Sequence, residues 1–134
     1  MDIYMDTCCY CRLFDDRSYP NIYIEHNSVM LIIELAQKRY INLIGSDILI
    51  KEISEIKNIY KRKILDSVLS LCSDLIEVTP DIIDRSIEIR NYTNIRTKDS
   101  IHLACGEKSK VDCFLTTDKK FMNNANRFVT DLEL

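Results

Sequence analysis

Four acidic residues are the strongest candidates for chemistry in this sequence. Asp6 directly follows a short apolar run, and Asp118 directly follows another. Asp99 lies in the first turn of a predicted helix, and Glu52 lies on the helix that follows a third apolar run. If these runs are neighbouring strands of one sheet, the four carboxylates converge at one edge of it.

Converging carboxylates favour a site for a hard divalent cation. Bare carboxylates a few ångströms apart repel each other, so that one of them would have to stay protonated. Mg²⁺ and Mn²⁺ remove this conflict, because they prefer oxygen ligands and often bridge to phosphate. Such a site polarises a phosphodiester and lowers the pKa of a bound water. Taken singly, each acid is better explained as a helix cap or a solvated surface group.

The cysteines offer a second chemistry, because three of them form the cluster Cys8, Cys9 and Cys11. A structural zinc site needs four ligands, generally from two separated pairs. The sequence has no second pair, and its only histidines are His26 and His102. We expect reduced thiols, because no secretory signal is visible, and we attach no chemistry to the cluster.

The elements that must position the acids follow from hydrophobic periodicity. Short apolar runs typical of buried strands occur at 3–5, 41–44, 75–78 and 113–116, with a fifth edge strand predicted at 128–130. Helical patterns occur at 21–40, 48–55, 58–72, 79–92, 97–108 and 118–125. The segment 8–20 is polar and is predicted to be irregular.

Strands that alternate with helices predict an α/β fold with an open, mostly parallel sheet. We expect three layers, α/β/α, with four to five strands in a single domain over residues 1–134. In such sheets, ligands bind outside the carboxyl ends of the strands. Asp6 and Asp118 stand at such ends.

Composition excludes several classes of protein. Lys and Arg total 18 against 21 Asp and Glu, a net charge of −3, which excludes a histone-like basic protein. Only two Gly and two Pro are present, which excludes a Gly-rich phosphate loop. The longest apolar stretch, 29–36, is too short to span a bilayer. We expect a cytoplasmic protein that does not contact a membrane.

Several segments resemble the motifs of the PIN-domain family. Residues 3–7 resemble its opening strand, and residues 46–52 resemble its second motif, in which a Ser-started helix carries a Glu. Residues 98–105 resemble its third motif, an Asp followed by small and apolar residues. Residues 111–121 resemble the fourth and most specific motif, a buried strand that ends in Thr-Thr-Asp. The similarity covers essentially the whole chain.

The resemblance implies a ribonuclease of the VapC-like toxin type, with strand order 3-2-1-4-5. Such a protein would hydrolyse RNA with Mg²⁺ or Mn²⁺, would be held in check by a small antitoxin and would form a homodimer. The family's catalytic and metal-binding acids map onto Asp6, Glu52, Asp99 and Asp118. Thr117 matches a hydroxyl position near the metal.

The sequence departs from the family pattern in three places. Glu55 lies three residues past Glu52 and is an alternative acid for the second motif. The turn at 107–110 lacks the usual Gly, and Cys8 and Cys9 stand where apolar residues are more common. None of these departures removes a candidate ligand.

Further residues are candidates for supporting roles. His102 shares a helical face with Asp99, and we expect it to hydrogen-bond near the metal rather than to bind it. Arg12, in the loop after Asp6, and Lys119, beside Asp118, are candidates for contact with the RNA phosphates. A basic run at 57–63 is either a solvated helix face or a track for the RNA backbone.

Two other functions stay open from the sequence. A non-catalytic interaction domain would keep the fold without the chemistry, and the presence of all four acids argues against it. A phospho-receiver module also binds Mg²⁺ at strand ends. Such a module has a pair of acids after its first strand, whereas this sequence has Asp6 followed by Thr7.

Overall fold

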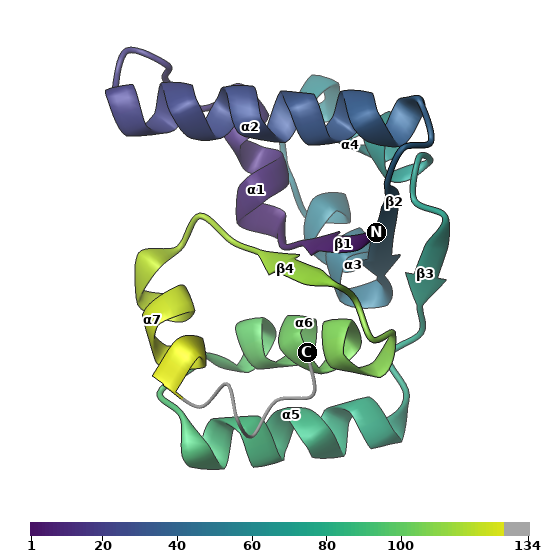
Figure 1. Ribbon diagram of the computed structural model, residues 1–134, viewed down its shortest axis with the longest axis vertical. Coiled ribbons are helices and arrows are strands. Elements are labelled where there is room, and N and C mark those ends of the chain that lie inside the picture. Colours follow the sequence, from purple (N-terminus) through teal and green to yellow (C-terminus); the bar gives the residue numbers. More distant parts are fainter. Residues whose placement is uncertain (128–134) are drawn as a thin grey trace.

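The fold is built on a parallel sheet, which Figure 1 shows in the computed structural model. The structure describes residues 1–127. In this range the strands are β1 (Asp2–Met5), β2 (Asn42–Ser46), β3 (Asp74–Ile76) and β4 (Cys113–Leu115). They lie in the order β3-β2-β1-β4, and every neighbouring pair is parallel. The predicted order is confirmed over these strands, and the strand predicted at 128–130 lies outside the described residues.

Helices connect the strands and cover both faces of the sheet (Figure 1). They are α1 (Thr7–Cys11), the 3₁₀ turn η1 (Arg12–Phe14), α2 (Pro20–Gln37), α3 (Asp47–Ser54), α4 (Ile59–Leu69), α5 (Pro80–Tyr92), α6 (Thr97–Lys108) and α7 (Lys119–Arg127). The predicted three-layer α/β/α class is therefore confirmed. The strand order also separates this chain from the receiver module, whose sheet has the order 2-1-3-4-5.

The core divides into two clusters because alternate residues of a strand face opposite sides of the sheet. On one face, Ile3 and Met5 of β1 pack with the buried sides of α2 and α4. On the other face, Tyr4 and Ile44 pack with residues of α5 and α6, such as Ile89 and Leu103. The site must therefore form where the two halves meet, at the carboxyl ends of β1 and β4.

The segment 8–20 contains helix, and the prediction of an irregular segment is wrong for its first half. The Asp6 side chain caps α1, since its Oδ1 accepts a hydrogen bond from the Cys9 amide at 3.3 Å. Cys9 and Tyr10 are buried beneath this short helix. One helical turn with a buried Cys has too little periodicity to be recognised as a helix from sequence.

Strand β2 extends two residues further than predicted, through Gly45 and Ser46. Pairing with β3 continues to the register Ser46↔Ile76, so both residues belong to the sheet rather than to a turn. A Cβ atom on Gly45 would lie 2.7 Å from Leu75 Cδ2, and the missing side chain permits this close approach. Ser46 is then the residue that caps α3, where its Oγ accepts from the Leu49 amide at 3.3 Å.

Candidate active site

Asp6 lies at the end of β1 and is almost completely buried, with 2% of its surface exposed. Its Oδ1 caps α1, but its buried Oδ2 meets no hydrogen-bond donor among the described residues. Burial raises the pKa of the Asp6 carboxyl above its ordinary value, and the negative charge of Asp99 adds to this rise. The Cys9 amide, which donates to Oδ1, opposes it. A buried carboxylate oxygen without a partner is a position where a cation would be stabilised.

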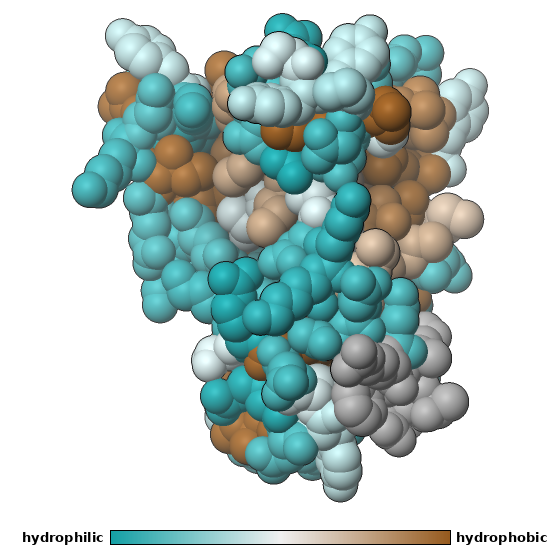
Figure 2. Space-filling view, turned by 90° about the vertical axis from the view of Figure 1, so that its left-hand side faces the viewer, coloured by the Kyte–Doolittle hydropathy of each residue, from teal (hydrophilic) through white to brown (hydrophobic). Residues whose placement is uncertain are grey.

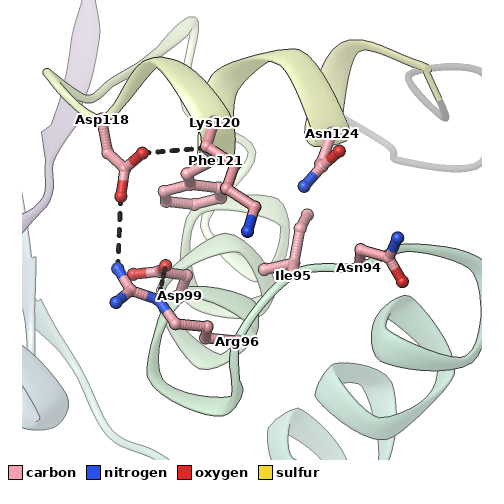
Figure 3. A pocket seen from close by; sticks show the side chains of 8 residues that line it. All are labelled: Asn94, Ile95, Arg96, Asp99, Asp118, Lys120, Phe121 and Asn124. Carbon is pink, nitrogen blue, oxygen red and sulfur yellow. Dashed lines mark hydrogen bonds and ion pairs between the residues drawn. The ribbon is translucent and has the colours of Figure 1, made fainter.

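Asp99 and Asp118 approach each other through a shared arginine (Figure 3). Arg96 Nε lies 3.3 Å from Asp99 Oδ2, and Arg96 Nη2 lies 3.2 Å from Asp118 Oδ2. Burial raises the pKa of Asp99, the Asp118 charge raises it further, and Arg96 opposes both. The Asp118 Oδ1 accepts from the Phe121 amide at 3.1 Å and so also fixes the start of α7.

Glu52 is held by a chain of buried hydrogen bonds that crosses the molecule. His102 Nε2 hydrogen-bonds Glu52 Oε1, and His102 Nδ1 lies 2.6 Å from the Tyr4 hydroxyl. The Tyr4 hydroxyl also lies 2.6 Å from Ser46 Oγ. Every bond is satisfied when Ser46 donates to Tyr4, Tyr4 donates to Nδ1, and Nε2–H donates to Glu52. Burial alone would raise the pKa of Glu52, but the hydrogen bond with His102 helps to hold it below its ordinary value.

Three of the acids lie near Cys8. Although Cys8 as a whole is exposed, desolvation of its thiol raises the pKa to about 12, and the negative charges of Asp6, Asp99 and Asp118 each contribute to that rise. Glu52 belongs to the same region, because it shares His102 with the surroundings of Asp6 and Asp99.

The acids nevertheless do not form a ready-made metal cage. In residues 1–127, no three Cys, His, Asp or Glu side chains are close enough together to hold an ion. The arrangement explains why, since Arg96 stands between Asp99 and Asp118 while Glu52 is turned toward His102. The predicted convergence is therefore seen as two linked groups rather than as one shell of ligands.

The donor set fits a hard divalent cation. All four candidates are carboxylates, the ligand type that Mg²⁺ and Mn²⁺ prefer. The unpartnered Oδ2 of Asp6 and the raised pKa values of Asp6 and Asp99 mark a deficit of positive charge. Arg96 supplies part of that charge from a side chain that is 75% exposed and free to leave.

Other predicted residues lie in different surroundings. Glu55 is exposed and lies 3.9 Å from Lys98, so Glu52 is the acid of the second motif that faces the site. Arg12 binds Asp15 and Glu25 at 2.8 and 2.6 Å. Its proposed phosphate contact stays a prediction, and it would require Arg12 to exchange these partners.

The predicted residues Thr117 and Lys119 each have a sequence neighbour that contacts Asp118 or lines the pocket beside it. Thr117 is half-buried, but its neighbour Thr116 is the residue whose hydroxyl accepts from the Asp118 amide at 3.1 Å. Lys119 is exposed, whereas Lys120 lines the pocket beside Asp118. The roles predicted for Thr117 and Lys119 stay predictions.

A pocket of about 150 Å³ opens beside Asp99 and Asp118. Its lining comes from the α5–α6 connection, the start of α6, and α7 (Figure 3), and consists of Asn94, Ile95, Arg96, Asp99, Asp118, Lys120, Phe121 and Asn124. Figure 2 views the side of the molecule on which α7 lies, and hydrophilic residues cover much of its centre. Arg96 was missed from the sequence, although its position three residues before Asp99 is the spacing of a helical ion pair.

The cysteines take no part in a metal cluster or a disulfide. All six are free, with Cys8 exposed, Cys9 buried and Cys11 half-buried. None of the helices in residues 1–127 is both long and apolar enough to cross a membrane.

Comparison with known proteins identifies the fold. No family model matches the sequence, and no curated protein matches it. Mycobacterium tuberculosis VapC20, a Sarcin-Ricin loop cleaving toxin, matches with a TM-score of 0.64 and 14% identity, over 90% of this chain and 93% of that chain. FitAcB from Neisseria gonorrhoeae matches with a TM-score of 0.61 and 19% identity, over 92% and 93%. VapBC2 from Rickettsia felis, bound to a promoter DNA fragment, matches with a TM-score of 0.60 and 20% identity, over 94% and 95%.

These matches cover nearly the full length of both chains, so the chain has the PIN-domain fold of VapC- and FitB-type toxin structures. The resemblance recognised in the four motifs is thus confirmed at the level of the fold. Identities of 14–20% do not transfer an activity, which has to be argued from the site.

Proposed function

We propose that this chain is a divalent-metal-dependent endoribonuclease that hydrolyses RNA phosphodiester bonds. The observation that carries the proposal is the buried, unpartnered Oδ2 of Asp6 beside the raised-pKa carboxyl of Asp99. A purely structural Asp at this position would have its second oxygen satisfied or solvated. The match to VapC20, a Sarcin-Ricin loop cleaving toxin, supports the same function.

Asp6, Asp99 and Asp118 are the residues that would hold Mg²⁺ or Mn²⁺, with Glu52 beside them. The bound ion would supply a lowered pKa for water and charge stabilisation for the leaving oxygen. Asp6 is rigidly placed, because it is tied to α1 by its cap. His102 favours the ionised form of Glu52 and fixes the position of its carboxylate. Arg96 balances the charge of Asp99 and Asp118 until the ion arrives.

We further propose that the chain is the toxin of a toxin–antitoxin pair, with a small antitoxin protein as its partner, and that it forms a homodimer. The matches to FitAcB and VapBC2 support the antitoxin partner, because these are structures of antitoxin–toxin complexes and VapBC2 is bound to a DNA fragment from its promoter. An antitoxin would have to mask a site rich in carboxylates, and a basic segment is the complementary chemistry.

The test is cleavage of single-stranded RNA with Mg²⁺ or Mn²⁺ present. Asp6→Asn and Asp99→Asn should each reduce cleavage by about a hundredfold or more, since each removes a ligand charge. Asp84→Asn, which alters an exposed acid on α5, is the matched control and should keep the wild-type rate. Wild-type rates in both site variants would refute the proposal.

One observation favours a second candidate, a non-catalytic PIN-like interaction domain. The described residues hold no preformed group of three metal ligands. Calorimetry with Mn²⁺ separates the two functions. Binding that disappears in Asp99→Asn supports the nuclease, and the absence of any binding to the wild-type chain supports the interaction domain.

A further inference from the structure

The polar groups that line the pocket in Figure 3 differ from one end of the pocket to the other. Asp118 stands at one end, where it meets Arg96. The side-chain amides of Asn94 and Asn124 stand at the opposite end, and the Lys120 ammonium lies between the two ends (Figure 3). The pocket therefore offers carboxylates, then cations, then amides along one line.

The three polar side chains beyond the acids have no partners among residues 1–127. Asn94, Lys120 and Asn124 form no side-chain hydrogen bond or ion pair with another residue of the range 1–127. Lys120 and Asn124 are four residues apart on α7, so both lie on one face of the helix. Asn94 lines the pocket from the α5–α6 connection, so two separate segments contribute polar residues to its wall.

The charge of the pocket suits a phosphodiester once the metal is bound. Asp99 and Asp118 contribute −2, and Arg96 and Lys120 contribute +2, which gives zero. A divalent cation changes the sum to +2. The pocket then attracts an anion, and it does so beside the ion at which the scissile phosphate is expected.

The volume of the pocket and the side-chain amides of Asn94 and Asn124 indicate which chemical group would bind next to that phosphate. The volume of about 150 Å³ is well below the range of roughly 300–1,000 Å³ found for sites that hold drug-sized ligands. A single planar base is of suitable size, and a duplex is not. An amide carries both a donor and an acceptor, which matches the edge of a nucleobase better than it matches a phosphate.

We propose that this pocket binds one unpaired nucleobase next to the scissile phosphate of single-stranded RNA. Asn94 and Asn124 hydrogen-bond the edge of the base, and Lys120 contacts the adjoining phosphate. Proteins that read RNA sequence commonly bind such unstacked bases by their edges. The inference rests on the proposed function and makes it more specific: cleavage should prefer particular bases at the cut site.

The experiment measures binding of the four nucleoside 5′-monophosphates and of ribose 5-phosphate with Mg²⁺ present. These probes have no internal phosphodiester to cleave, and ribose 5-phosphate lacks the base. At least one nucleotide should bind about fivefold or more tightly than ribose 5-phosphate and should shift the side-chain amide resonances of Asn94 and Asn124. Asn94→Ala and Asn124→Ala should each weaken the binding of that nucleotide by about fivefold, which is the effect of one lost hydrogen bond.

Two asparagines that lie near Asn94 and Asn124 in the sequence provide matched controls. Asn123→Ala on α7 and Asn91→Ala on α5 change exposed asparagines that do not line the pocket, so both should bind like the wild type. Equal binding of ribose 5-phosphate and all four nucleotides would overturn the proposal, because the pocket would then hold phosphate alone. Equal losses of nucleotide affinity in Asn123→Ala and Asn124→Ala would overturn the proposal as well.

A cleavage assay separates this inference from the proposed function. If wild-type protein cuts RNA and Asn94→Ala and Asn124→Ala keep its base preference, the base pocket is wrong and the nuclease stands. If wild-type protein cuts no RNA but nucleotides still shift the two amides, the nuclease is wrong and the base pocket stands.

Discussion

At the scale of single residues, Asp6 serves both the fold and the site. Its Oδ1 caps α1, and its Oδ2 is buried without a donor in the described part of the chain. The two oxygens therefore have opposite effects on stability in the absence of metal. The cap stabilises the start of α1, whereas the buried charge destabilises the folded state.

Asp6→Asn should raise the melting temperature of the metal-free protein at about pH 7. Asparagine caps a helix as well as aspartate does, and it carries no buried charge. Since burial raises the pKa of Asp6, the wild type is stabilised relative to the unfolded chain while the carboxyl is protonated and loses that stability as the pH rises through the raised pKa. The gain from Asp6→Asn should thus shrink toward pH 4.

Thermal melts with a chelator present, at several pH values, check this expectation. A variant that is less stable than the wild type at pH 7 would contradict it. A difference in melting temperature that is independent of pH would contradict the assignment of the effect to ionisation.

Arg96→Gln should bind Mn²⁺ more tightly than the wild type does. The guanidinium contacts Asp99 and Asp118, so a metal ion at the two carboxylates must displace it. Because Arg96 is mostly exposed, its removal should cost little stability. Titration calorimetry measures the change, which should be several-fold. Arg90→Gln alters an exposed arginine outside the pocket and is the control; unchanged or weaker Mn²⁺ binding in Arg96→Gln would argue against competition.

At the scale of elements, the buried hydrogen-bond chain links four of them. Ser46 ends β2, Tyr4 lies in β1, His102 lies in α6, and Glu52 lies in α3. The same chain that orients the acid also joins the two core clusters, because Tyr4 belongs to one cluster while α3 contributes Leu49 to the other. Orientation of Glu52 and docking of the elements are therefore coupled.

Tyr4→Phe should destabilise the fold by about 1–3 kcal/mol, because it leaves the Ser46 hydroxyl without its acceptor and His102 Nδ1 without its donor. Urea denaturation measures the change in the free energy of unfolding. Tyr92→Phe, at an exposed tyrosine at the end of α5, is the control and should have little effect. If Tyr4→Phe lowers the free energy of unfolding no more than the control does, the buried hydrogen bonds contribute nothing to stability.

The sequence was sufficient for the elements whose signals are local. Alternation of apolar runs with helical periodicity predicted the layers, and the motifs of the resembled family supplied the strand order. Helix α1 was missed because one turn has no periodicity, and the end of β2 was missed because a Gly-Ser pair also suits a turn. The four acids were located, but the contacts that hold them are non-local: Arg96 reaches Asp118 across 22 residues and His102 reaches Glu52 across 50.

At the scale of the whole molecule, α2 and α4 expose apolar side chains on the side of the sheet away from α5 and α6 (Figure 1). On α2, Ile24 and Leu31 are seven residues apart and so lie on one face of the helix. On α4, Ile59 and Ile64 are about half exposed. We propose that a second copy of the chain covers these exposed side chains, as the proposed homodimer requires.

Leu31→Asp should convert a dimer into a monomer, because it places a charge in an apolar interface. Leu31 is 55% exposed, so the substitution should leave the core intact. Light scattering after size-exclusion chromatography gives the mass. Gln37→Asp places the same charge six residues further along α2, rotated by about 120° around the helix axis from Leu31, and should remain dimeric. A wild-type chain that is monomeric at high concentration would exclude the proposed dimer.

The parallel sheet has one consequence for how the protein is made. β4 pairs with β1, so the strand that ends beside Asp118 docks against the first strand of the chain. A ribosome therefore synthesises residues 1–118 before the last of the four acids can join the first. A growing or prematurely terminated chain that lacks this segment lacks Asp118. If the chain is the RNA-cutting toxin proposed above, an unfinished copy carries no assembled site with which to cut the messenger that encodes it.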